Sequence, residues 1–229
     1  LAAGTTIEFD GGGAQTAKTS AVAGYQNVDV TGVAGTSSVN MSNVSSILGN
    51  LTFTNAAAMN TNAVLNVNGN LSYGSSGTTL VANDINVNGT SGSTFSAGIV
   101  NLNGKKLTTS GFLLSGGTIQ SGVAAAIINV NVGDWTNNSG TFTNTNIDVQ
   151  FSGTAYQQIT GAQISAFKNV IVDKGTSITS MVEAVSGGSG MSMSGQLTLS
   201  NGMLKLTHAS SSAEFNSSVT TSSTSGLWI

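Results

Sequence analysis

A five-residue pattern, in which apolar and polar residues alternate and a glycine follows, recurs along the chain and constrains its fold more than any other feature. Alternation with a period of two is typical of a β-strand that buries one face, and Asn-Gly is a strong turn signal. Successive glycines of the first three copies are 20 and then 15 residues apart, a plausible length for one turn of a repeat protein. The copies are Leu65-Asn66-Val67-Asn68-Gly69, Ile85-Asn86-Val87-Asn88-Gly89, Val100-Asn101-Leu102-Asn103-Gly104 and, with methionine at the apolar positions, Met191-Ser192-Met193-Ser194-Gly195.

A longer repeat supports the same interpretation. Two segments match at an offset of 142 residues, which is close to seven turns of about 20 residues. A second alignment, between residues 67–73 and 193–199, has an offset of 126, so the later segment is shorter by 16 residues, roughly one turn. A solenoid tolerates this difference because each turn contacts only its neighbours, whereas a closed barrel has a globally fixed strand order. The matches at 142 pair Ile7-Glu8-Phe9-Asp10-Gly11 with Val149-Gln150-Phe151-Ser152-Gly153, and Gln15, Tyr25, Asn27, Val28 and Val30 with Gln157, Phe167, Asn169, Val170 and Val172.

The composition fits a long stack of strands. The chain has no proline, and only 7% of its residues are charged. Proline would remove a hydrogen bond from a central strand, and like charges stacked on adjacent strands would repel each other. We therefore predict an all-β fold, a right-handed parallel β-helix (β-solenoid) of about ten to twelve rungs with wide Gly-rich turns. We expect one domain over residues 1–229, with related copies at roughly 4–145 and 146–229, the second incomplete.

Charge and hydropathy exclude two kinds of partner. The net charge is −3, and the lysines are scattered except for Lys105-Lys106, so we expect no nucleic-acid partner. No stretch approaches 18 consecutive apolar residues, so we expect no membrane span. The first residues do not form a signal peptide, and the absence of cysteine excludes a disulfide framework.

The repeats resemble a known class. The first copy runs through Gly4-Thr5-Thr6-Ile7-Glu8-Phe9, Gln15 and Tyr25-Gln26-Asn27-Val28-Asp29-Val30, and the second ends at Gly195-Gln196-Leu197-Thr198-Leu199-Ser200-Asn201-Gly202. This pattern, over most of the chain, is similar to the repeats of large secreted cell-surface proteins of Bacteroidota, which are adhesin-like or fibre-forming β-solenoids. The resemblance implies an extracellular or cell-surface location and transfers no catalytic residue. The chain departs from this class in having no proline.

Catalytic chemistry finds little support in the sequence. Glu8 and Asp10 are the closest pair of carboxylates, but Gln150 and Ser152 replace them in the second copy, and a solvated strand edge explains them better. His208 is the sole histidine, without the three or four ligands that a metal site needs. We expect no enzyme, no cofactor and no metal. A polysaccharide lyase-like enzyme and an incidental calcium ion on Asp10 or Asp134 remain as alternatives.

The ends of the chain look like the middle of a turn. Both are apolar, and exposed apolar strand edges invite association. We therefore expect an extracellular structural protein, a rod-like segment of a surface fibre or adhesin, whose partners are other copies of itself stacked end to end or the rest of a longer chain. The expected assembly residues are Leu1, Ala2, Ala3, Leu227, Trp228 and Ile229.

The alternative function is a carbohydrate-binding module of a surface protein. Surface glycans would then be the partners, and exposed aromatic side chains on one outer face would stack on the sugars. Tyr25 aligns with Phe167 between the two copies, so we expect this position to be buried instead. The aromatic candidates are Tyr25, Tyr73, Trp135, Tyr156 and Trp228.

Overall fold

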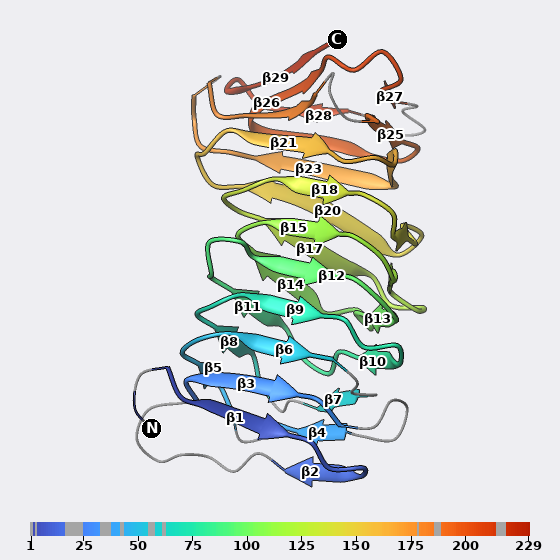
Figure 1. Cartoon of the computed structure of the whole chain (residues 1–229). Helices are drawn as coiled ribbons and strands as arrows, with labels where there is room; N and C mark the ends of the chain where they lie inside the picture. Colours follow the sequence, from blue (N-terminus) through green and yellow to red (C-terminus); the bar gives the residue numbers. More distant parts are fainter. Residues whose placement is uncertain are drawn as a thin grey trace.

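The chain coils into a three-faced stack of parallel strands (Figure 1). The computed structural model describes residues 2, 4–16, 25–32, 38–41, 44–54, 58–60, 63–177, 179–185, 189–213 and 219–229, and these contain strands but no helix. The chain crosses the near face of Figure 1 from left to right and returns across the far face while it climbs, so the coil is right-handed. About nine complete turns of three strands lie between β3 and β28. This confirms the predicted β-solenoid, with slightly fewer turns than expected.

Face 1 is the near face of Figure 1, and its strands follow one another without interruption from the first turn to the last. All of its strand pairs are parallel. Its strands are β1 (Thr6–Phe9), β3 (Asn27–Val30), β6 (Leu51–Phe53), β9 (Leu71–Tyr73), β12 (Ser93–Phe95), β15 (Phe112–Leu114), β18 (Trp135–Asn137), β21 (Gln157–Thr160), β24 (Met181–Ala184), the second half of β26 (Leu197–Leu206) and β29 (Ser225–Trp228).

Face 2 follows face 1 along the chain and consists of short strands in three groups. The first group is β2 (Ala14–Thr16), β4 (Ser38–Asn40) and β7 (Ala58–Asn60); the second is β10 (Thr78–Leu80), β13 (Ile99–Asn101), β16 (Thr118–Gln120) and β19 (Thr141–Phe142); the third is β22 (Ser165–Phe167), β25 (Met191–Met193) and β27 (Ser212–Ala213).

Face 3 completes each turn and leads back to face 1. The long strand β26 joins the two faces, because its first half pairs with β23 on face 3 and its second half with β24 on face 1. The strands of face 3 are β5 (Ser46–Ile47), β8 (Leu65–Val67), β11 (Ile85–Val87), β14 (Lys106–Thr109), β17 (Ala126–Val130), β20 (Ile147–Ser152), β23 (Asn169–Asp173), the first half of β26 and β28 (Thr220–Thr221).

The interior is a set of apolar columns, because inward residues lie above one another in each parallel pair. One column of face 3 consists of isoleucine, leucine and valine only. Burial of such columns is the main stabilising contribution to the fold. The members of this column are Leu65, Ile85, Leu107, Ile128, Val149, Val170 and Leu197.

Aromatic rings fill the middle of the stack. The Trp135 ring stacks on the Phe112 ring with centroids 4.0 Å apart and planes 10° apart, and the rings of Phe142 and Phe167 meet it edge-on. The indole N–H of Trp135 donates a hydrogen bond of 2.9 Å to Ser165 Oγ, so its polar atom is satisfied inside the core. This packing removes Trp135 from any contact with an external ligand.

The repeat positions Tyr25 and Phe167 are both buried, which confirms the prediction made for them. Tyr73 is buried as well, and its hydroxyl accepts a hydrogen bond of 2.9 Å from Thr79 Oγ1. Of the aromatic residues proposed as sugar-stacking candidates, only Tyr156 and Trp228 are exposed.

Asparagine side chains cap the corner between face 3 and face 1 in the first turns. Asn27 Oδ1 accepts a hydrogen bond from the backbone N–H of Asn50, and Asn50 Oδ1 accepts one from Asn70, each 2.9 Å long. The residue before each capped residue must be glycine, because atoms of the turn below approach it closely. A Cβ atom on Gly69 would lie 2.4 Å from Asn50 Oδ1 and 2.5 Å from the Gly49 carbonyl carbon. The glycine in the sequence pattern therefore makes room for the asparagine of the turn below.

The five-residue pattern marks strands on more than one face. Its first two copies lie on face 3, in β8 and β11. The copy at residues 100–104 begins in β13 on face 2, and the copy at 191–195 begins in β25, also on face 2. The spacing of 15 residues between Gly89 and Gly104 is therefore not one turn. A strand with one buried face followed by a tight corner fits any face, so the pattern does not specify which.

The two copies of the longer repeat also lie on different faces. Ile7–Phe9 belong to β1 on face 1, whereas the matching residues 149–151 belong to β20 on face 3. Residues 27–30 in β3 on face 1 likewise match residues 169–172 in β23 on face 3. The offset of 142 residues thus spans six complete turns and two faces of the next, and not seven turns.

Local structure nevertheless agrees between the matched segments. Asn169 Oδ1 accepts a hydrogen bond of 2.8 Å from the backbone N–H of Gln196, just as the matching Asn27 does from Asn50. A Cβ atom on Gly195 would lie 2.4 Å from Asn169 Oδ1. The repeated sequence therefore encodes the asparagine-capped corner, which is used at a different edge of the solenoid in each segment.

Candidate functional site

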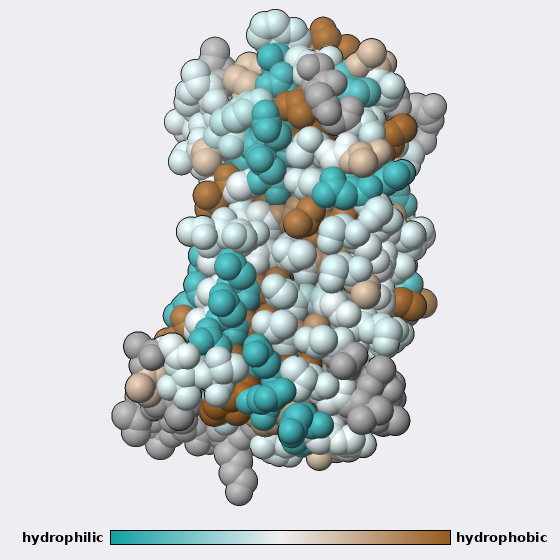
Figure 2. All heavy atoms as spheres, in the orientation of Figure 1, coloured by the Kyte–Doolittle hydropathy of each residue, from teal (hydrophilic) through white to brown (hydrophobic). Residues whose placement is uncertain are grey.

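The side chains best placed to meet a ligand lie on the outer surface of face 1 in the last turns. They form a band that we call the face-1 strip. Figure 2 shows hydrophilic side chains gathered over this part of the near face. The strip consists of Asp134, Tyr156, Gln158, Glu183, Lys205 and Trp228.

The strand register builds the strip. Gln158 of β21 pairs with Glu183 of β24, Glu183 pairs with Lys205 of β26, and Lys205 pairs with Trp228 of β29. Their neighbours along each strand point inward, so these four side chains point outward one above another. Asp134 continues the line below, where its Oδ1 accepts a hydrogen bond of 2.7 Å from the Gln158 backbone N–H.

Glu183 is the centre of a hydrogen-bond network. It accepts hydrogen bonds from the Tyr156 hydroxyl at 2.6 Å and from Thr207 Oγ1 at 2.9 Å, and it forms an ion pair with Lys205 Nζ at 3.1 Å. The bond from Tyr156, followed by those from Lys205 and Thr207, holds the pKa of Glu183 below its ordinary value of 4.5. Desolvation, followed by the same bond to Glu183, raises the pKa of Tyr156 above 10.0. The carboxylate is therefore charged and fixed in direction at neutral pH.

Two aromatic rings flank this network. Tyr156 is 45% exposed and Trp228 is 59% exposed. Gln158 Nε2 donates a hydrogen bond of 3.2 Å to the Tyr156 hydroxyl, and Lys205 Nζ lies 5.2 Å from the centroid of the Trp228 ring. Both rings are held by polar neighbours from adjacent turns.

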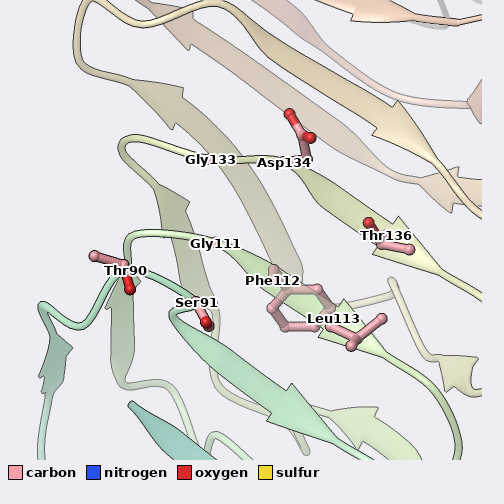
Figure 3. A pocket seen from close by; sticks show the side chains of 8 residues that line it. All are labelled: Thr90, Ser91, Gly111, Phe112, Leu113, Gly133, Asp134 and Thr136. Atoms are coloured by element: carbon pink, nitrogen blue, oxygen red, sulfur yellow. The ribbon is translucent and has the colours of Figure 1, made fainter. Parts of the chain in front are cut away.

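A hollow of about 310 Å³ adjoins the lower end of the strip (Figure 3). It lies where the corner before face 1 has glycine instead of a side chain, at Gly111 and Gly133. Figure 3 shows the Asp134 carboxylate above the hollow and Thr90 and Ser91 below it. The hollow and the strip therefore share Asp134. The remaining lining residues are Phe112, Leu113 and Thr136.

A second polar group lies inside the solenoid. The Lys174 side chain has no exposed surface, and its Nζ donates hydrogen bonds to Gln157 Oε1 at 2.5 Å and to the Ser152 carbonyl oxygen at 3.3 Å. Gln157 Nε2 in turn donates to the carbonyl oxygens of Val130 and Gly133. No carboxylate within the described ranges pairs with Lys174, and desolvation lowers its pKa from 10.5 to about 8.

The expected assembly residues differ in their exposure. Leu1 and Ala3 lie outside the described residues, and Ala2 is exposed. Leu227 is partly buried against the core, whereas Trp228 and Ile229 are exposed.

Among the sequence candidates for catalysis and metal binding, Glu8 and Asp10 lie in the first turn and His208 lies at a separate place, after β26. Glu8 and Asp10 are both exposed, and Glu8 Oε1 accepts a hydrogen bond of 2.6 Å from Thr31. His208 Nδ1 accepts one of 3.0 Å from the Ser210 backbone. In the part of the chain that the structure describes, no three His, Cys, Asp or Glu side chains come together to hold a metal ion. That part also has no helix long and apolar enough to span a membrane.

Comparison with known proteins adds nothing to this geometry: no family model, no curated protein and no solved structure matches the chain.

Sequence reasoning missed both the strip and the buried pair of Gln157 and Lys174. The strip depends on turns of unequal length, so its residues share no fixed spacing. Tyr156 and Trp228 were named as candidates, but their common face follows only from the register. Lys174 looks like a surface residue because it is charged, but the alternation of β23 places it two positions after the buried Val172, on the same inward side.

Proposed function

We propose that the protein is a structural, rod-like segment of an extracellular fibre or surface adhesin, and that a second copy extends it end to end. The support is geometric. In the described part of the chain, β1 pairs with β3 alone and β29 pairs with β26 alone among the strands of face 1. Within the described residues, neither strand has a partner on its other side, which we call its free edge, and such edges pair with other strands.

The two edges are complementary. Both belong to face 1 and run in the same direction. In the proposed assembly, β29 of one copy would therefore add to β1 of the next as another parallel pair. Ile7 and Phe9 at one end and Leu227 at the other are partly buried residues packed against the core. Stacking would bury them further. Such a head-to-tail contact repeats without closing and produces a filament.

A substitution in β1 tests this proposal. Thr5 and Phe9 direct their carbonyl oxygens to β3, where Asn27 and Thr31 donate to them at 3.0 Å. Residues alternate along a strand, so the N–H of Glu8 points to the free edge. Glu8→Pro removes this donor and leaves the β1–β3 hydrogen bonds in place.

We expect the wild-type protein to show a molar mass that rises with concentration in size-exclusion chromatography with light scattering. Glu8→Pro should remain monomeric, because the edge has lost one donor and the proline ring obstructs the approach of a second strand. Glu8→Ala is the matched control, since it loses the same side chain but keeps the N–H, and it should assemble like the wild type. A monomeric wild type at every concentration would contradict the proposal.

The extracellular location rests on the resemblance of the repeats to secreted surface proteins. Protease treatment of intact cells that carry the protein tests it. We expect the protein to be degraded while a cytoplasmic marker survives, and protection of both would contradict the location.

A further inference from the structure

We propose that the face-1 strip binds an extended, neutral polysaccharide chain. This goes beyond the structural role and does not depend on it, because the side chains of the strip point outward from the side of the rod, although Trp228 itself belongs to β29 of the stacking edge. Four observations carry the proposal: exposed rings, fixed polar groups, a lysine that is paired with a glutamate, and the direction of the strip.

The rings give the strip its apolar contact surface. Tyr156 and Trp228 are large, exposed side chains, each with a polar atom beside an apolar ring. The C–H face of a pyranose ring packs against such a ring, while the sugar hydroxyls reach polar groups at its side. In the described part of the chain, every other tyrosine and tryptophan is buried, so the exposed ones are both in this strip.

The polar groups between the rings suit hydroxyls. Gln158 supplies an amide with donors and an acceptor, and Glu183 supplies carboxylate oxygens, while Thr207 beside the strip supplies a hydroxyl. These groups are fixed by bonds across neighbouring turns before any ligand arrives. Preorganised side chains on strands lose little conformational entropy on binding.

The charge of the strip favours a neutral ligand. Glu183 and Lys205 form an ion pair, which leaves Lys205 no uncompensated positive charge for a polyanion. The remaining charge is negative, on Asp134, which already accepts a hydrogen bond from Gln158. An acidic polysaccharide would therefore be repelled at one end and gain no cation at the other.

The direction of the strip favours a chain over a single sugar. Neighbouring strands are about 4.8 Å apart, so the three steps from Gln158 to Trp228 cover roughly 14 Å along the rod axis. The hollow beside Asp134 extends the same line downward. A ligand that contacts both rings must therefore be longer than one pyranose unit.

Affinity gel electrophoresis tests this inference with a panel of soluble neutral polysaccharides: hydroxyethyl cellulose, barley β-glucan, xyloglucan, arabinoxylan, galactomannan, pullulan and dextran. We expect at least one to retard the wild-type protein. Tyr156→Ala and Trp228→Ala should each weaken this retardation at least tenfold in apparent dissociation constant. Leu80→Ala is the matched control, because Leu80 is a large exposed residue of face 2, and it should bind like the wild type.

Two outcomes would overturn the inference: no retardation by any member of the panel, or equal retardation of the wild type and a Tyr156→Ala/Trp228→Ala double variant. Circular dichroism and thermal melting of each variant check that it is folded, and Glu183→Gln provides a second variant that keeps both rings. Light scattering on the same samples separates this result from the stacking proposal, since Tyr156→Ala should assemble normally even where it no longer binds.

Discussion

The first turns and the later turns of the solenoid differ in the length and hydrogen bonding of the corner from face 3 to face 1. In the first turns, the corner from face 3 to face 1 is three residues long, at residues 48–50 and 68–70. Asparagine side chains cap it from turn to turn. In later turns, the same corner has four residues, at residues 131–134 and 153–156.

The difference teaches what longer corners require. A short corner leaves backbone N–H groups that a side chain from the turn below can reach, so one residue type serves repeatedly. A longer corner leaves the carbonyl oxygens of Val130 and Gly133 inside the solenoid, where Gln157 satisfies them and Lys174 satisfies Gln157. The irregular turns also carry the charged and aromatic residues of the face-1 strip.

The largest loss of stability should come from adding a side chain at the glycine of the regular corner. Gly69→Ala should lower the free energy of unfolding by about 2–4 kcal/mol, because its Cβ would lie far inside contact distance of Asn50 and the Gly49 backbone. Gly13→Ala is the control, since nothing lies within 4 Å of its added Cβ, and it should change stability little. Urea denaturation measures both. Equal stability of the two variants would show that the corner does not need its glycine.

The buried Lys174 at the irregular corner should make the stability of the protein depend on pH. The pKa of Lys174 is about 8 in the folded protein and near 10.5 when exposed, so between these values only the unfolded chain binds the proton. Stability should therefore rise across this window, by up to about 3 kcal/mol. Below pH 8 the cost of the buried charge is present in full.

Lys174→Met isolates this contribution, because methionine is similar in length and cannot be charged. The difference in unfolding free energy between wild type and variant should change between pH 8 and pH 10.5, in favour of the wild type at higher pH. Denaturation at several pH values measures it. A difference that is constant with pH would mean that Lys174 is solvated in the folded protein.

Removal of one asparagine cap should have an intermediate effect. Asn50→Ala leaves the Asn70 backbone N–H without its acceptor, and we expect a loss of about 1–2 kcal/mol. Asn50→Asp keeps an acceptor at the same place and should recover most of the loss. Thermal melting compares the three proteins, and an aspartate variant no better than alanine would contradict the capping role.

The smallest effect should come from the surface network. Glu183→Gln breaks the ion pair to Lys205, which is partly solvated, so a loss of about 0.5–1 kcal/mol is expected at neutral pH. The folded-state pKa of Glu183 is lowered, so its contribution is present above the ordinary value of 4.5 and is lost as the pH falls through the lowered value. Melting at pH 7 and at successively lower pH values, with low and high salt, measures this, and a loss that does not decrease as the pH falls below 4.5 would argue against the ion pair.

Much of this fold could be predicted from the sequence, but the position of each residue on it could not. Alternating residues and Asn-Gly corners predict stacked strands, and the burial of Tyr25 and Phe167 followed from their match. The face to which a strand belongs could not be predicted, because all three faces need the same pattern. The unequal length of the turns then hides which residues lie above one another. That is why the pairing of Glu183 with Lys205 emerged only from the register.

The most direct measurement of the central claim is electron cryomicroscopy of the purified protein at high concentration. The proposed stacking predicts filaments in which the strand spacing of about 4.8 Å runs parallel to the long axis, with β29 of one copy paired to β1 of the next. Uniform short particles, with no strand pairing between copies, would contradict it.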